Sequence, residues 1–188
     1  LTSIDNRQLL AITPTGHHYD QLSTRDIPIV DFDGNVLDGE LPPSSEILLH
    51  VATYRARPDV SAVVHSHPLF ATVAAVHGYE IPPIVDELVA TIGGSVRVSQ
   101  YARPGTQELG KAAVLSLGKR KAVLLRHHGL LSVGHSISEA TDIAHLVERT
   151  AQIFVFATLL GPVPSIPIES IATGTQIHQA HLQARLES

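Results

Sequence analysis

Histidines follow apolar runs at two places in this chain, in residues 63–68 (VVHSHP) and in residues 124–129 (LLRHHG). In an extended strand, residues i and i+2 project from the same face, so His65 and His67 can approach one metal ion together. A third ligand from the second segment would close the site. Because side chains alternate between the faces of a strand, only one of the two adjacent histidines there can point toward that ion.

The ligand types available limit which metal such a site could hold. The sequence contains no cysteine, and histidine with carboxylate ligands suits a hard or borderline divalent cation. Zinc is the leading candidate, with manganese and cobalt as alternatives. Catalytic zinc sites use about three protein ligands and leave one coordination position open to water or substrate. Glu46 is the candidate carboxylate.

Each of these residues also has an ordinary structural explanation. A histidine in an apolar setting is more often a hydrogen-bonded core residue than a ligand, and 12 histidines make chance pairs common. Glu46, near the start of a predicted helix, would complement the helix dipole without binding anything. His50 lies one turn later on the same helical face and is a candidate for an outer position behind the ligands. The residues by themselves leave both explanations open.

Small hydroxyl residues and a glycine form a second candidate site, for an anion. Such residues are ordinary turn and capping residues in most proteins. Hydroxyls and free N–H groups at a helix N-terminus also bind phosphate, and here the same helix start carries Glu46. Phosphate and metal would then be neighbours, as a phosphorylated sugar would require. The residues concerned are Thr15, Gly16, Ser44 and Ser45.

The composition describes one compact domain over residues 1–188. The chain is 44% hydrophobic and 16% charged, which suits a single buried core and some apolar surface between subunits. A net charge of -5 without Lys/Arg clusters argues against nucleic acid or an anionic membrane as partner, so a small molecule is expected. No apolar run reaches the roughly 18 residues of a membrane span, and no basic-then-apolar leader opens the chain. We therefore expect a cytoplasmic protein.

Hydrophobic periodicity and turn residues predict a mixed α/β protein. The strands expected are residues 9–13, 27–32, 36–37, 60–65, 96–98, 122–125 and 130–133. The helices expected are one capped by Ser44 or Ser45 and ending before Pro58, one over 69–76, one from Thr106 to Gly118, and one over 136–160 opened by a Ser136–Glu139 capping box. Residues 85–90 are ambiguous between helix and strand, and the tail beyond Pro167 is expected to be a weak helix at best.

Five short motifs occur in one order along nearly the whole chain. They are residues 12–16 (ITPTG), 41–46 (LPPSSE), 65–67 (HSH), 101–106 (YARPGT) and 127–130 (HHGL). In this order they resemble the class II aldolase/adducin family, and in particular its aldolases. Each motif alone is weak, but their ordered combination is specific.

The resemblance implies a role for each matching residue. The metal ligands would be His65, His67 and His128, with Glu46 both as a ligand and as the acid/base near the reacting carbon. The activity implied is reversible retro-aldol cleavage of a sugar phosphate like L-fuculose 1-phosphate. It yields a dihydroxyacetone-phosphate-type ketone and an aldehyde through a metal-stabilised enediolate. Phosphate would be held by Thr15, Gly16, Ser44 and Ser45.

The fold so implied is a three-layer α/β/α arrangement with a central, mostly antiparallel sheet, usually assembled into a homotetramer with active sites at subunit boundaries. The same site would also suit a decarboxylase, an epimerase or a dehydratase of a related sugar phosphate, because these reactions share the metal and the proton shuttle. A noncatalytic interaction domain like that of adducin is a third alternative, against which the intact set of ligands argues.

The chain departs from the aldolases of this family at two places. It begins about where their phosphate loop should end, so the N-terminal helix and the Gly-Asn start of that loop are expected to be missing. Where they carry a tyrosine between the histidine pair and Gly93-Gly94, this chain has an acidic pair. Asp86 or Glu87 is therefore a candidate to replace a phenolic proton donor, which leaves the exact substrate open.

Overall fold

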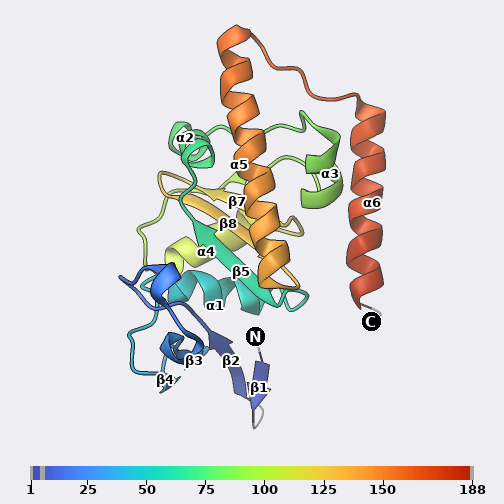
Figure 1. The fold of residues 1–188 in the computed structure, drawn as a ribbon. Coiled ribbons are helices and arrows are strands. Elements are labelled where there is room, and N and C mark those ends of the chain that lie inside the picture. Colours follow the sequence, from blue (N-terminus) through green and yellow to red (C-terminus); the bar gives the residue numbers. More distant parts are fainter. Residues whose placement is uncertain (1, 5–6, 187–188) are drawn as a thin grey trace.

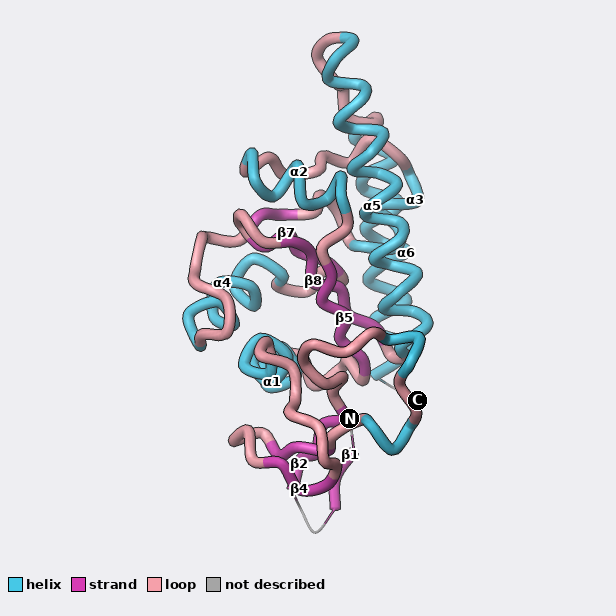
Figure 2. Tube along the Cα trace, turned by 60° about the vertical axis from the view of Figure 1, so that its left-hand side comes forward, coloured by secondary structure: helices cyan, strands magenta, loops and turns pink. Residues whose placement is uncertain are grey.

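The computed structural model describes residues 2–4 and 7–186, which form two β-sheets and six α-helices arranged in layers (Figure 1). Helices cover both faces of a central sheet, and a smaller sheet from the N-terminal part of the chain lies beside helix α1 (Ile47–Ala56) (Figure 2). The three-layer α/β/α fold implied by the resemblance is confirmed.

The central sheet is mostly antiparallel, as expected. Its strand order is β5 (Ala62–Ser66), β8 (Gly129–Gly134), β7 (Ala122–Leu125) and β6 (Arg97–Val98). The pairs β5–β8 and β8–β7 are antiparallel, and β7–β6 is parallel. His65 lies opposite Leu131 in the first pair, so the histidine-bearing end of β5 meets the start of β8. One end of the sheet therefore carries both histidine segments.

Side chains alternate across this sheet and build one core on each face. On β7, Val123 and Leu125 belong to one core, while Ala122 and Leu124 belong to the other. All four are fully buried, and each of the larger side chains contributes roughly 1.5–3 kcal/mol when removed from water. The first core is covered by α1 and α4 (Gln107–Leu117), and the second by α2 (Leu69–His77), α3 (Asp86–Ile92) and α5 (Ile137–Leu160).

The smaller sheet is an antiparallel meander that contains the predicted hairpin. The Asp31 carboxylate accepts hydrogen bonds from both the backbone and the side-chain amide of Asn35, and Gly34 in the turn has a φ of 90°. Two short 3₁₀ helices, Tyr19–Gln21 and Thr24–Asp26, connect its second and third strands. The strands, in order, are β1 (Thr2–Ile4), β2 (Arg7–Ala11), β3 (Ile29–Asp31) and β4 (Val36–Asp38).

Helix α5 begins where the capping pattern predicts. The Ser136 hydroxyl accepts a hydrogen bond from the Glu139 N–H at 3.1 Å, and the Glu139 carboxylate accepts one from Lys121 at 2.7 Å. By length and composition this helix could also span a bilayer, but one such helix is weak evidence. One face of α5, which includes Ile143 and Val147, is buried in the second core, as in the core helix of a globular protein.

The expectation for the tail was wrong, because α6 (Ile168–Leu186) is a helix of 19 residues that packs along α3. Its own sequence has little amphipathic pattern and an internal glycine, so local propensity is weak. Tertiary contacts stabilise it instead: Gly174 lets the helix approach Val89 closely, and the buried ring of His178 lies between the carbonyl oxygens of Thr91 and Lys119. The same packing resolves the ambiguous residues 85–90 as the start of helix α3.

Candidate metal centre

Three of the predicted ligands meet at one end of the central sheet. His65 is on β5, His67 lies just beyond its end, and His128 lies in the turn between β7 and β8. The Nε2 atoms of His65 and His67 are 3.1 Å apart, and those of His65 and His128 are 3.3 Å apart. Two Zn–N bonds of about 2.0–2.1 Å at a tetrahedral angle place their nitrogens roughly 3.3 Å apart. The ligand atoms of all three rings lie within 4.8 Å of one another, so the group could hold one ion.

The ring of His65 is oriented by the neighbouring strand. Its Nδ1 lies 2.9 Å from the carbonyl oxygen of Leu130. Because a carbonyl only accepts hydrogen bonds, Nδ1 carries the proton and Nε2 keeps the lone pair that a metal needs. Such a carbonyl partner is the usual outer support of a metal-binding histidine. Sequence reasoning did not find Leu130, since a backbone carbonyl leaves no trace in residue type.

The rings of His65 and His128 are kept neutral by their surroundings. The pKa of His65 falls to about 3, chiefly through burial, with the hydrogen bond to Leu130 opposing the shift and the ring of His128 adding to it. Burial also lowers the pKa of His128, while the negative charge of Glu46 opposes that change. Neutral imidazole is the form that binds metal, so these rings need not lose a proton at neutral pH.

Glu46 approaches the histidines from α1. It occupies the N-cap position of that helix, and its backbone N–H donates to the Ser44 hydroxyl at 3.2 Å. The expectation that a serine side chain caps the helix was wrong, because the helix starts one residue later and the Ser44 hydroxyl bonds the N-cap residue instead. One carboxylate oxygen, Oε2, is buried without a hydrogen-bond partner among the described residues.

A buried carboxylate oxygen without a donor is costly unless a cation balances its charge. The negative charge of Glu46 already acts on His128, which places the carboxylate beside the imidazoles. Three imidazole nitrogens and this oxygen are a donor set that fits a divalent metal ion. His50, one turn into α1, is electrostatically close to His65, and burial lowers its pKa to about 4. This is the outer position predicted for it.

The side chains of His127 and His128 point to different sites, as expected, but strand alternation is not the reason. Both residues lie in a turn, and His127 has a φ of 54°, the one positive value among the described residues other than glycine. This left-handed conformation turns its ring toward Tyr101, at 6.0 Å between ring centroids, while His128 joins the histidine group.

The two segments of the candidate anion site are joined to each other. The segment around Thr15 pairs with the segment around Ser44 through backbone hydrogen bonds of 3.0 and 3.1 Å. Within the described part of the chain, the N–H groups of Gly16 and Ser45 donate to no other residue. Since Ser45 directly precedes Glu46, these free donors lie next to the candidate ligand.

The acidic pair on α3 lies elsewhere. Asp86 lines a hollow between α3 and α6, and Glu87 forms an ion pair with Arg149 on α5. An acid/base role for either residue at the histidine group would therefore need a second subunit to bring it there. That role stays a prediction.

The family is identified by comparison with known proteins. Residues 2–155 match the family model described as the class II aldolase and adducin N-terminal domain. A solved structure of L-fuculose 1-phosphate aldolase superposes with a TM-score of 0.86 at 35% identity, and the match covers 92% of this chain and 81% of that one.

Three curated relatives carry different activities in their names. L-fuculose phosphate aldolase of Escherichia coli is 39% identical over 87% of this chain and 76% of its own length. 5-deoxy-D-ribulose 1-phosphate aldolase of Bacillus thuringiensis is 38% identical over 88% and 78%. 3-oxo-tetronate 4-phosphate decarboxylase of Haemophilus influenzae is 32% identical over 80% and 72%. The chain therefore belongs to the class II aldolase and adducin family, as the ordered motifs had indicated.

Proposed function

We propose that this chain is a metal-dependent aldolase that cleaves a phosphorylated sugar into a dihydroxyacetone-phosphate-type ketone and an aldehyde. The observation that carries the proposal is the group of three imidazoles with the unpartnered carboxylate oxygen of Glu46 beside it. Relatives named as sugar-phosphate aldolases, at 38 and 39% identity, support the reaction class.

The ion would be held by His65, His67, His128 and Glu46. When bound, it would supply Lewis acidity toward the oxygen on which negative charge develops as the carbon–carbon bond breaks. Zinc is the metal we favour, because the ligands are imidazole and carboxylate and the His65 and His128 nitrogens are at a tetrahedral spacing. Manganese and cobalt accept the same ligands.

Glu46 would move the proton in this reaction. Its Oε2 is buried and receives no hydrogen bond from the described residues, so it is able to accept a proton from the substrate. Its backbone is held at the N-cap of α1 by Ser44, which orients the side chain toward the histidines. His50 behind the group would remain neutral and keep the surroundings of His65 dry.

The phosphate of the substrate would be bound by Thr15, Gly16, Ser44 and Ser45. The free N–H groups of Gly16 and Ser45 support this assignment, since their two segments are hydrogen-bonded to each other and unpaired backbone donors near a helix start can bind an anion. The enzyme would act as a homotetramer, an assembly in which Asp86 or Glu87 of a neighbouring subunit could face the substrate.

A decarboxylase of a related sugar phosphate is the second candidate. It is favoured by the relative named 3-oxo-tetronate 4-phosphate decarboxylase, at 32% identity. Both reactions would use the same ligands and the same carboxylate, so a substrate screen separates them. Release of an aldehyde from a phosphorylated ketose supports the aldolase, and release of carbon dioxide from a phosphorylated keto acid supports the decarboxylase.

The test of the proposal is metal-dependent cleavage by the wild type and by Glu46→Gln. The substitution keeps the shape but cannot accept the proton, so we expect kcat at saturating metal to fall by about 10²–10⁴-fold, with weaker metal binding because one proposed ligand is replaced. Elemental analysis of both proteins separates lost chemistry from lost metal. An unchanged rate in the variant would remove the role assigned to Glu46, and a purified protein that binds no divalent ion would favour the noncatalytic domain.

A further inference from the structure

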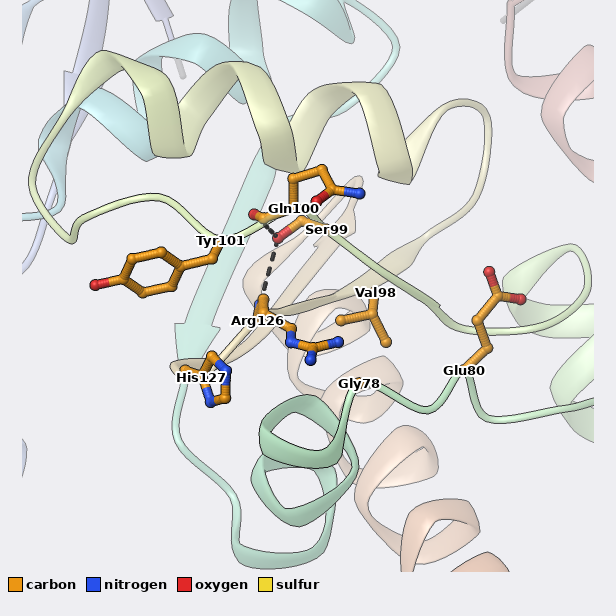
Figure 3. Close-up of a pocket in the computed structure, with 8 residues that line it drawn as sticks. All are labelled: Gly78, Glu80, Val98, Ser99, Gln100, Tyr101, Arg126 and His127. Carbon is orange, nitrogen blue, oxygen red and sulfur yellow. Dashed lines mark hydrogen bonds between the residues drawn. The ribbon is translucent and has the colours of Figure 1, made fainter.

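A second cavity lies on the other side of His127, away from the histidine group. Its volume is about 590 Å³, within the range of small-molecule sites. It is bounded by the C-terminal end of α2, the segment from Val98 to Tyr101, and the end of β7 (Figure 3). No family motif discussed above includes the charged residue at its centre, Arg126.

The guanidinium of Arg126 occupies the middle of this cavity, between Val98 and Gly78 (Figure 3). Among the described residues it donates no hydrogen bond and forms no ion pair, although its backbone N–H lies 3.4 Å from the Ser99 hydroxyl. Gly78 has a φ of 84°, which favours glycine, and its lack of a side chain leaves room for the guanidinium to lie against it. The five N–H donors of Arg126 remain open.

Two further polar rings adjoin the same cavity, and their geometry is specific. His127 is exposed and holds a left-handed φ of 54°, a conformation that costs of order 1–3 kcal/mol for a residue other than glycine. Tyr101 contacts it edge-on and is 63% exposed. The imidazole N–H of His127 can donate to an oxygen that Arg126 binds, whereas the Tyr101 hydroxyl points away from Arg126 (Figure 3).

The negative charge in the cavity does not neutralise Arg126. Glu80 lies at the far side in Figure 3, where it accepts a hydrogen bond from the Ser95 hydroxyl at 3.1 Å and acts electrostatically on Arg120. A half-buried, unpaired guanidinium beside a further donor is an arrangement that recognises a phosphate or carboxylate.

We infer that this cavity binds the phosphate or carboxylate group of a small molecule through Arg126, with His127 as an additional donor. The site is separate from the phosphate position of the proposed substrate, because Thr15 and Ser45 belong to other loops. Its link to the metal centre is through the sequence, where His127 of the cavity is followed directly by His128 of the histidine group. The inference does not depend on the proposed reaction.

Equilibrium dialysis of the zinc-loaded full chain against labelled inorganic phosphate, and separately against labelled malonate, tests this site. We expect Arg126→Gln to bind one anion fewer per chain than the wild type, or to bind it at least about tenfold more weakly, because hydrogen bonds to charged groups are the strong ones. Arg97→Gln is the matched control, since Arg97 is an exposed arginine on the adjacent strand that does not line the cavity.

Arg126→Lys keeps the charge without the planar fork and guards against a folding defect in the glutamine variant. We expect it to bind the anion more weakly than the wild type and more tightly than Arg126→Gln. If affinity falls from wild type to Arg126→Lys to Arg126→Gln with phosphate, the cavity recognises a phosphate group. If it falls in this order with malonate, the cavity recognises a carboxylate group. Equal binding of both probes by the wild type and Arg126→Gln, or an equal loss in Arg97→Gln, would overturn the inference.

Discussion

His128 and His127 are neighbours in the sequence, yet they belong to two sites built in different ways. The histidine group around His128 stands on paired strands, with the ring of His65 tied to the Leu130 carbonyl and Gly129 packed against His67. The cavity around His127 is formed by a turn, a loop and a helix end, and its side chains are more exposed.

The two sites are therefore held in place by different parts of the structure. At the metal centre, the register between β5 and β8 sets where each imidazole lies, so geometry is prepared before a ligand arrives. At the neighbouring cavity, one strained backbone position and the packing of Arg126 over Gly78 set the geometry. Substitutions can therefore disturb one site and spare the other.

His67→Ala should give the largest effect. Removal of one of three imidazoles should weaken metal binding by more than about 100-fold, since even outer-shell substitutions cost 10–100-fold, and metal-dependent activity should be lost with it. Elemental analysis after dialysis measures the first effect. His127→Ala is the control and should keep its metal. Full retention of metal by His67→Ala would contradict its role as a ligand.

Gly129→Ala tests whether strand packing positions the metal centre. The added carbon would lie 2.5 Å from the Ser66 carbonyl oxygen and 2.7 Å from the ring of His67. We expect about 1–3 kcal/mol of destabilisation and about tenfold weaker metal binding. Gly134→Ala, at the other end of β8 and 2.8 Å from the Ala140 nitrogen, should lose stability but keep metal affinity. Equal metal affinities in the two variants would argue against strand control of the site.

Ser45→Ala separates the two anion sites. Loss of a hydrogen bond to a charged phosphate should raise KM by about tenfold with little change in kcat, and should leave anion binding at Arg126 intact. Steady-state kinetics with a phosphorylated ketose measures this. Ser138→Ala, an exposed serine on α5, is the control. A fall in kcat with unchanged KM would place Ser45 in the chemical step instead.

His127→Gly should give the smallest effect, a gain in the free energy of unfolding of about 0.5–1 kcal/mol, because glycine adopts the φ of 54° without strain. Denaturant unfolding of the metal-free protein measures it. His127→Ala removes the same ring without relieving the backbone and should show no such gain. Equal stabilities of the two variants would mean that the turn is unstrained.

Much of the fold was predictable because its elements are marked locally. The apolar runs of β7 and β8, the Ser136 cap and the turn glycines each specify an element through nearby residues. The exception is α6, whose helix depends on Gly174 approaching Val89 and on the burial of His178. Such contacts join residues more than 80 positions apart and leave no local pattern.

The sequence by itself determined which chemistry is available: imidazoles at i and i+2 on a strand, one carboxylate at a helix start, and no thiolate. Only the tertiary structure decided which of two adjacent histidines joins the group, and that Leu130 orients it. Both outcomes depend on one backbone angle and on a strand register that pairs His65 with Leu131 and so brings the Leu130 carbonyl to the His65 ring. A linear pattern specifies donors, but convergence requires the packed sheet that brings distant donors to one point.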